Sequence, residues 1–216
     1  MSEIIISVSN AVKDFKNHRV IDEVSLEFER GKIYGIVGRN GSGKTVLFKC
    51  ICGFTPLTSG KIFVNGKVVG KDINIPKNIG VIIETPGFLP NYSGYKNLRF
   101  LASINNKISK DDICNTLSAV GLDPKSKKHV GKYSLGMRQR LGIAQAIMEN
   151  PDILILDEPM NGLDNDGVKD IRNLLLKIKG EGKTILLASH NREDISVLCD
   201  EVYEMDKGVL IEKESA

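Results

Sequence analysis

The sequence predicts an α/β fold in which a mainly parallel sheet stands beside an antiparallel N-terminal sheet. Short apolar runs bounded by turn residues are typical of strands buried on both faces, as in parallel sheets. These runs lie at residues 33–37, 80–83, 153–156 and 184–188. Half-alternating segments at residues 24–29 and 61–64 indicate strands with one solvated face, and the Asn65-Gly66 pair suits a type I′ hairpin turn.

Helical patterns dominate the middle of the chain. Ser109, with Asp112 three residues later, forms an N-terminal cap pattern, and Gly121 ends the helix that follows. Further helices are expected at residues 136–150 and 166–180, where apolar residues recur at helical spacing.

The helical patterns form one block within a single domain. Neither an internal repeat nor a low-complexity linker interrupts the 216 residues. We therefore interpret residues 88–150 as a helical subdomain inserted between core strands of one domain that spans residues 1–216.

Composition excludes several classes of function. Hydrophobic residues make up 41% and charged residues 26%, as in ordinary globular proteins. The formal net charge of +3 comes without a basic stripe, so no nucleic-acid partner is expected. Apolar runs are too short to cross a bilayer as a helix, and residues 1–6 lack the pattern of a secretion signal. Any transport would need another polypeptide.

The four cysteines are scattered along the chain, at Cys50, Cys52, Cys114 and Cys199. Their spacing suits no shared metal site. We expect reduced thiols packed as small apolar side chains, without a chemical role.

A glycine-rich loop predicts a phosphate site between the strand at 33–37 and an apolar helix beginning near Lys44. The loop comprises Gly38, Arg39, Asn40, Gly41, Ser42, Gly43, Lys44 and Thr45. In this pattern, backbone N–H groups and a helix N-terminus surround a β-phosphate, the lysine lies between β- and γ-oxygens, and the hydroxyl can ligate Mg²⁺. A chance glycine-rich turn is the alternative.

A pair of carboxylates ends the strand at 153–156. Asp157 is expected to hold Mg²⁺ through water, and Glu158 is the candidate general base for an attacking water. Without the glycine-rich loop upstream, a buried strand that runs into a polar loop would be the favoured interpretation of these residues.

Two further segments resemble motifs of the ABC ATPases. Residues 133–140 read Tyr-Ser-Leu-Gly-Met-Arg-Gln-Arg, whereas the signature of that family is usually Leu-Ser-Gly-Gly-Gln. Ser134 and Gly136 match this signature. Without the family, the segment is a capped amphipathic helix.

Later in the chain, residues 161–164 are similar to the D-loop, which ends here at Asp164, and His190 after the strand at 184–188 is similar to the switch histidine. The strand would deliver His190 to the sheet edge that carries Gly38 and Asp157. Phe15 stands where the family has an aromatic that stacks on adenine. A structural histidine and a core phenylalanine are the alternatives.

The sequence departs from the family pattern at two positions of the site. Glu84 replaces the glutamine that most members have at the end of a core strand, which places a carboxylate near the expected metal and water. This Glu, and the stretch that continues to Asn91, resemble the bacitracin and lantibiotic resistance branch. Val46 replaces a hydroxyl residue, which implies one lost hydrogen bond to the α-phosphate.

The resemblance covers the whole chain and implies a P-loop NTPase core. The implied catalytic residues are Lys44, Glu84, Glu158 and His190. The implied metal ligands are Thr45, Asp157 and Glu84. ATP would be bound by the glycine-rich loop at residues 38–45 together with Phe15, Val46, Ser134, Gly136 and Asp164. It implies the ATP-hydrolysing subunit of an exporter of peptide antibiotics or drugs, cytoplasmic and peripheral on the inner face of the membrane.

Two kinds of partner are also implied. A second cassette would dimerise so that Ser134 and Gly136 face its γ-phosphate, and a separate membrane permease would dock on the loop expected at residues 84–95. For that loop, simple anchoring is the alternative. The rival functions are an ABC-type ATPase with soluble partners in cofactor assembly, translation or DNA repair, and a small-molecule kinase or GTPase.

Overall fold

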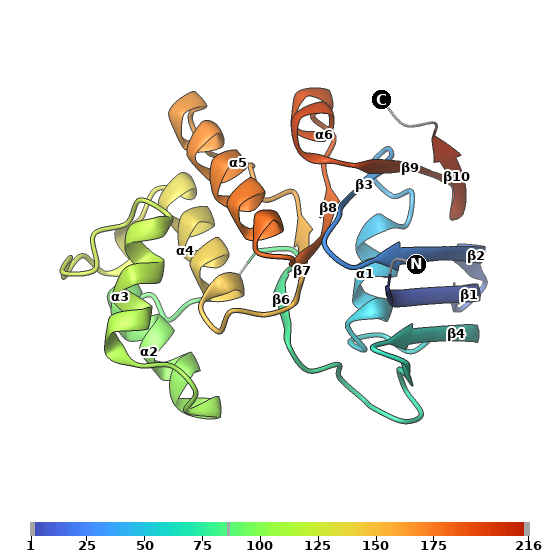
Figure 1. Cartoon of the computed structure of the whole chain (residues 1–216), viewed down its shortest axis with the longest axis horizontal. Helices are drawn as coiled ribbons and strands as arrows, with labels where there is room; N and C mark the ends of the chain where they lie inside the picture. The colour runs from blue at the N-terminus through green and yellow to red at the C-terminus, as the bar shows by residue number, and fades with distance from the viewer. Residues whose placement is uncertain (1–2, 86, 214–216) are drawn as a thin grey trace.

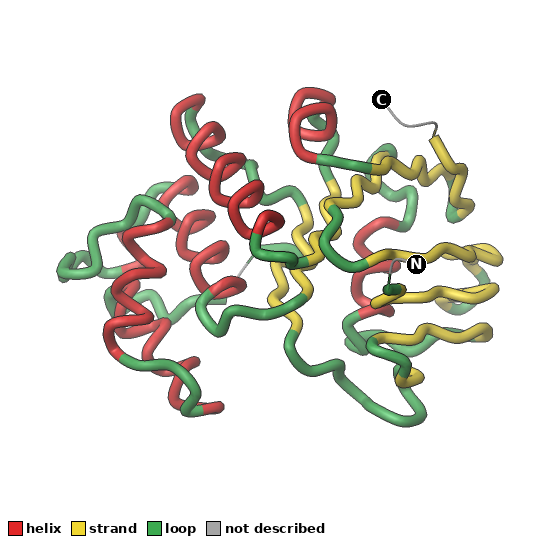
Figure 2. Tube along the Cα trace, viewed as in Figure 1, coloured by secondary structure: helices red, strands yellow, loops and turns green. Residues whose placement is uncertain are grey.

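The computed structural model describes residues 3–85 and 87–213, so Pro86, inside the stretch from Glu84 to Asn91, lies outside the described residues. The predicted α/β fold is confirmed: a mainly parallel sheet lies between an antiparallel sheet and a group of helices (Figure 1). In Figure 2, the helices α2 to α4 lie at one end of the molecule, and the strands β1, β2 and β4 lie at the other.

The larger sheet has the strand order β10-β9-β3-β8-β7-β6 and is parallel except for the β9–β10 hairpin. Its strands are β3 (Ile33–Val37), β6 (Ile79–Ile82), β7 (Ile153–Asp157), β8 (Thr184–Ala188), β9 (Glu201–Asp206) and β10 (Val209–Lys213). The segments after β3, β7 and β8 therefore meet at one edge of the sheet, as expected for parallel strands.

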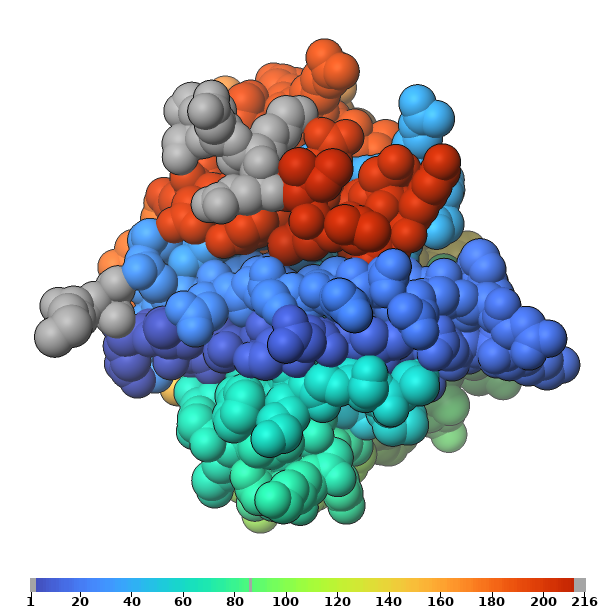
Figure 3. All heavy atoms as spheres, turned by 90° about the vertical axis from the view of Figure 1, so that its right-hand side faces the viewer, coloured from blue at the N-terminus to red at the C-terminus, as the bar shows by residue number. Residues whose placement is uncertain are grey.

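The smaller sheet is antiparallel, with the order β2-β1-β4-β5. Its strands are β1 (Ile4–Phe15), β2 (His18–Glu29), β4 (Ser59–Val64) and β5 (Lys67–Val68). Asn65 and Gly66 have φ of 50° and 72°, which gives the type I′ turn predicted between β4 and β5. Figure 3 looks onto this end, where the first strands lie between the C-terminal strands and the β4–β5 segment.

The helices are α1 (Lys44–Ile51), α2 (Gly94–Asn105), α3 (Lys110–Ala119), the 3₁₀ turn η1 (Val130–Lys132), α4 (Leu135–Ile147), α5 (Asn165–Gly180) and α6 (Arg192–Leu198). The cap predicted for α3 is confirmed as a complete capping box between Ser109 and Asp112. Among the described helices, none is long and apolar enough to cross a membrane.

Two of the predicted boundaries differ from the observed ones for a visible structural reason. The helix expected at 136–150 ends at Ile147, because Asn150 takes the left-handed φ of 51° that turns the chain into β7. The loop expected at 84–95 ends at Ser93, whose side chain accepts a hydrogen bond from the backbone N–H of Lys96 and so begins α2. The extent of one domain over residues 1–216, with an insertion at 88–150, stays a prediction.

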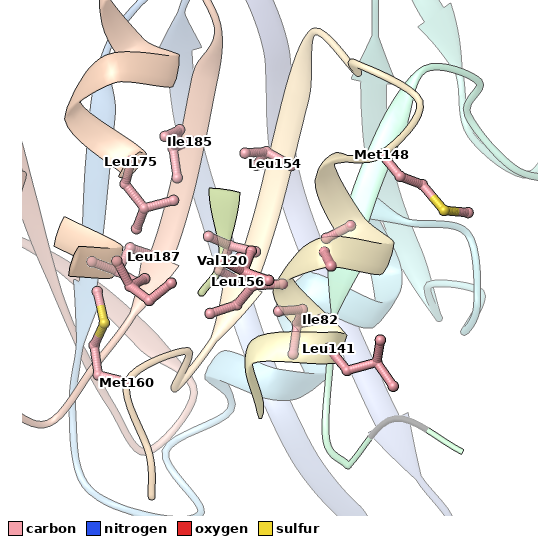
Figure 4. Close-up of a cluster of buried hydrophobic side chains, with 14 of the residues drawn as sticks. Ile82, Val120, Leu141, Met148, Leu154, Leu156, Met160, Leu175, Ile185 and Leu187 are labelled. Carbon is pink, nitrogen blue, oxygen red and sulfur yellow. The ribbon is translucent and has the colours of Figure 1, made fainter. Parts of the chain in front are cut away.

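Alternate residues of the parallel strands fill two separate cores. Leu154 and Leu156 of β7 pack with α2 to α6, whereas Ile153 and Ile155 of the same strand pack with α1 and the antiparallel sheet. The helical side of the sheet is drawn in Figure 4, where Leu154, Leu156 and Leu187 lie among residues of the helices. Burial on both faces explains the uninterrupted apolar runs and makes a rigid platform for the loops at the strand ends.

Candidate functional site

A cleft of about 630 Å³ opens at the carboxyl ends of the parallel strands. It is lined by the loop between β3 and α1, by the end of β7 and by the N-terminal part of α4; the lining includes residues 40–46, Glu84, Leu135, Asp157 and Glu158. Segments that are far apart in sequence thus meet where α/β proteins bind ligands.

The glycine-rich loop is shaped to receive an anion. Gly38 has φ of 152°, and a Cβ there would lie 2.2 Å from the carbonyl oxygen of Met205. Gly41 has φ of 81° and open space around its missing Cβ. Ser42 is 5% exposed, and its Oγ has no hydrogen-bond partner among the described residues. An unsatisfied buried hydroxyl in a glycine-rich loop at the N-terminus of α1 fits a phosphate oxygen, so these residues fit the phosphates of ATP.

The ammonium of Lys44 lies inside the loop. Only 7% of the residue is exposed, and Nζ donates hydrogen bonds to the carbonyls of Gly38 at 2.7 Å and Arg39 at 3.1 Å. An ammonium has three donors, so the loop orients the charge and leaves one donor for a ligand.

Thr45 and Asp157 come into direct contact. The Thr45 hydroxyl donates a hydrogen bond of 2.6 Å to Oδ2 of Asp157. Hydroxyl and carboxylate oxygens are ligands that Mg²⁺ accepts beside water and phosphate, so this pair fits the predicted metal.

Glu158 lies between His190 and α4. Its Oε2 is 2.9 Å from Nδ1 of His190, and Gln139 Nε2 donates to its backbone carbonyl at 3.3 Å and to that of Pro159 at 3.0 Å. Glu158 also has φ of 50°, a left-handed conformation that is uncommon for a side chain of this kind. Such backbone strain is found preferentially at functional sites.

Glu84 lies in the same cleft but is paired with a lysine. Lys49 Nζ of α1 donates to Glu84 Oε1 at 2.5 Å, and Glu84 has φ of 62°. The carboxylate is thus held by α1, next to the residues that would bind metal, and 65% of the Glu84 side chain remains exposed. Lys49 was not singled out from the sequence, where it is one lysine on a helix.

Ser134, Gly136 and Asp164 lie together at a second cleft of about 460 Å³. Ser134 caps α4 and Asp164 caps α5, each by accepting a backbone N–H. Gly136 lies so close to the segment after β7 that a Cβ would be 2.8 Å from the carbonyl oxygen of Gly162. The signature-like and D-loop-like segments therefore form one continuous surface.

The remaining predicted residues lie around the loop. Asn40 and Val46 line the first cleft, and Val46 also packs against the core beneath it. Phe15 does not line this cleft; it ends β1 with 46% of its surface exposed, and Lys13 Nζ lies 4.8 Å from its ring centre. The alternative of a core phenylalanine is wrong, because Phe15 is exposed where it pairs with His18 at the end of the β1–β2 hairpin.

Gln139 is a site residue that the sequence analysis missed. Its amide holds the two backbone carbonyls that follow β7, and so fixes the turn that presents Glu158. The available signal was its place near the end of the signature-like segment, one turn into the expected helix, which does not by itself distinguish it from a surface residue.

Comparison with known proteins decides the family. A family model described as ABC transporter matches residues 21–161. The chain belongs to the ABC transporter family. The match spans the glycine-rich loop, the signature-like segment and the paired carboxylates, so as a family member the chain is an ATP-binding, ATP-hydrolysing cassette.

Similar proteins with curated names indicate the branch of the family that this chain resembles. The uncharacterized ABC transporter ATP-binding protein YybJ of Bacillus subtilis (strain 168) is 46% identical over 95% of this chain and 94% of that protein. The bacitracin transport ATP-binding protein BcrA of Enterococcus faecalis is 41% identical over 98% of this chain and 69% of that protein. The lantibiotic transport ATP-binding protein SrtF of Streptococcus pyogenes is 34% identical over 97% of this chain and 91% of that protein. The resemblance to the bacitracin and lantibiotic branch is confirmed.

A solved structure confirms the P-loop NTPase core of the fold. It is titled as the dimeric structure of a post-hydrolysis state of the ATP-binding cassette MJ0796 bound to ADP and Pi. Its TM-score to this chain is 0.88, at 19% identity over 98% of each chain. The antiparallel sheet, parallel sheet and helical group of this ABC cassette thus follow an arrangement already seen in a solved cassette.

Proposed function

We propose that this cassette hydrolyses Mg²⁺-bound ATP to drive export of a peptide antibiotic or related drug by a separate membrane permease, and so confers antibiotic resistance. One observation carries the proposal: the glycine-rich loop, the Thr45–Asp157 pair and Glu158 share one cleft. The substrate class is supported by the names of BcrA and SrtF, which describe bacitracin and lantibiotic transport.

ATP binding rests on the loop from Gly38 to Thr45. Its backbone N–H groups and the Ser42 hydroxyl would donate hydrogen bonds to phosphate oxygens, and Lys44 would provide the positive charge between the β- and γ-phosphates. Phe15 offers an exposed ring on which the adenine stacks. Val46 has no hydroxyl group and adds only an apolar contact at the cleft wall.

Thr45 and Asp157 are the proposed metal ligands, with Glu84 as an additional carboxylate. Bound Mg²⁺ would neutralise negative charge on the phosphate oxygens. One oxygen of Glu84, Oε1, accepts a hydrogen bond from Lys49.

Glu158 is the proposed general base. Its carboxylate would accept the proton of a water aligned with the γ-phosphate, and His190 would hold Glu158 and contact that phosphate. Gln139 fixes the backbone on which Glu158 stands.

Two exposed surfaces support the proposed partners. Ser134, Gly136 and Asp164 would face the nucleotide of a second cassette, because they share the exposed surface of the second cleft. The permease would dock over the segment at 84–93 and the start of α2, where Leu89 and Tyr92 are exposed. The cassette would then lie on the cytoplasmic face of the membrane.

Growth under antibiotic tests the proposal. Production of the chain with its permease in a bacitracin-sensitive host should raise the bacitracin concentration that stops growth, and Glu158→Gln should abolish that gain. If the wild-type pair protects no better than the variant pair, export of this substrate class is wrong.

A further inference from the structure

A buried ion pair joins α5 to the segment that carries His190. Asp194, in the first turn of α6, is 1% exposed. Its Oδ1 accepts hydrogen bonds from Nε of Arg172 at 2.9 Å and from Nη2 at 2.6 Å, and the Arg172 side chain is itself only 13% exposed. A carboxylate in so dry a place is stable only when it is paired and hydrogen-bonded, and both conditions are met here.

The other oxygen of Asp194 reaches the residue before His190. Ser189 is 2% exposed; its Oγ donates to Asp194 Oδ2 at 3.3 Å and accepts the backbone N–H of Asn191 at 3.1 Å. The backbone on both sides of His190 is therefore fixed by one hydroxyl. The His190 side chain is 66% exposed, yet its Nδ1 lies 2.9 Å from Glu158 Oε2.

The network also connects His190 with the D-loop-like segment. Arg172 stands on α5, and α5 begins at the cap formed by Asp164. A displacement of this helix would reach His190 through the chain of contacts from Arg172 to Asp194 to Ser189.

We propose that Arg172 and Asp194, acting through Ser189, position His190 against Glu158 and so set the rate of ATP hydrolysis. This inference rests on the proposed roles of His190 and Glu158. None of the three residues touches the reacting atoms, so they are positioning residues. Misplacing a catalytic side chain by about 1 Å costs rate rather than binding, because the substrate contacts lie elsewhere.

A purely structural role, in which the pair only packs α5 on α6, predicts different behaviour. In that case Ser189 would be dispensable, since its loss leaves both Arg172 contacts to Asp194 intact. Under the positioning role, Ser189 is the link that transmits the position of Asp194 to His190.

Steady-state ATPase kinetics separate the two roles. Ser189→Ala and Asp194→Asn should each lower kcat about tenfold and leave the ATP KM within about twofold of wild type. The matched control is Glu193→Gln: Glu193 also pairs with Arg172, at 3.0 Å, but its side chain is 70% exposed, and the carboxylate that the Ser189 hydroxyl bonds is that of Asp194. This control should keep the wild-type kcat.

A double-mutant cycle measures the coupling between Ser189 and His190 in kcat, which a purely structural role would not produce. In a His190→Ala background, adding Ser189→Ala should cause no further loss of kcat, because both changes remove the same effect. Losses that multiply, or a Ser189→Ala enzyme with wild-type kcat, would overturn the inference. Should Asp194→Asn fail to fold, Ser189→Ala and the cycle decide alone.

The cycle also separates this inference from the proposed function. If His190→Ala leaves kcat unchanged, the role of His190 in the proposed function is wrong and this inference falls with it. If His190→Ala lowers kcat and Ser189→Ala does not, only the positioning network is wrong.

Discussion

The hydroxyl of Thr45 donates a 2.6 Å hydrogen bond to Asp157, although the two residues are 112 positions apart in sequence. Thr45 follows β3 and Asp157 ends β7, and β8 lies between these strands in the sheet. The contact therefore depends on the parallel strand order, which brings the glycine-rich loop and the carboxylates to one edge. It holds two oxygen groups where a nucleotide-bound metal would be coordinated.

Loss of the Thr45 hydroxyl should change the metal requirement of the enzyme. We expect Thr45→Ala to raise the Mg²⁺ concentration needed for half-maximal ATPase activity, because one metal ligand and the partner of Asp157 disappear together. Thr45→Ser keeps the hydroxyl and is the control. A Mg²⁺ titration of Thr45→Ala that overlays the wild-type curve would exclude Thr45 as a ligand.

Loss of the Lys44 ammonium should weaken ATP binding itself. A charge-assisted hydrogen bond is worth about 1.5–3 kcal/mol, so Lys44→Ala should raise the Kd for ATP roughly tenfold to a hundredfold. Lys61→Ala removes an exposed lysine of β4 and serves as the control. Isothermal titration with ATP measures both, and equal Kd values would contradict the phosphate site.

Gly80 tests the packing of α4 on β6. A Cβ at Gly80 would lie 1.9 Å from the backbone oxygen of Ala146, so Gly80→Ala forces the helix and strand apart. We expect a loss of about 1–3 kcal/mol in the free energy of unfolding, measured by urea denaturation. Gly180→Ala, at the open end of α5, should stay within about 1 kcal/mol of wild type, since nothing lies near its missing Cβ.

The thiols of buried Cys50 and Cys52 and of partly buried Cys199 should resist alkylation in the native protein. Burial raises the pKa of Cys50 to about 11 and the pKa of both Cys52 and Cys199 to about 12. Since the thiolate is the reactive form and these pKa values leave very little of it at pH 8, the three should react slowly in the native protein and quickly after unfolding. Mass spectrometry after iodoacetamide treatment identifies the labelled residues, and fast native labelling of Cys52 would contradict the packing of α1.

Much of the fold was predictable because burial leaves a direct trace in sequence. A strand covered on both faces must be apolar throughout, which marked residues 184–188 as β8 with the observed bounds. The hairpin turn at Asn65-Gly66 and the cap at Ser109 depend on local chemistry alone, and both were found.

Other elements lack such a trace. The strands β9 and β10, at the edge of the larger sheet, and the helix α2 were not predicted individually. In β9, charged Glu204 separates buried Val202 and Tyr203 from buried Met205, so no continuous apolar run marks it. Partial exposure of this kind weakens the regular spacing of apolar residues from which strands and helices are recognised.

The site was predictable as a set of residue types, but its pairings were not. The sequence suggested a carboxylate at Glu84 near the metal; the structure adds that Lys49 holds it. Likewise, the left-handed backbone of Glu158 and its contact with His190 arise from how β7 and β8 end together, which neither segment reveals alone.

The central claim is that Glu158 activates water beside an ATP held by the glycine-rich loop, and single-turnover ATP hydrolysis by Glu158→Gln tests it most directly. General-base catalysis contributes about 10²–10⁴-fold, so the variant should bind ATP with the wild-type Kd and hydrolyse it slower by that factor. Hydrolysis at the wild-type rate, with ATP bound as tightly, would contradict the account.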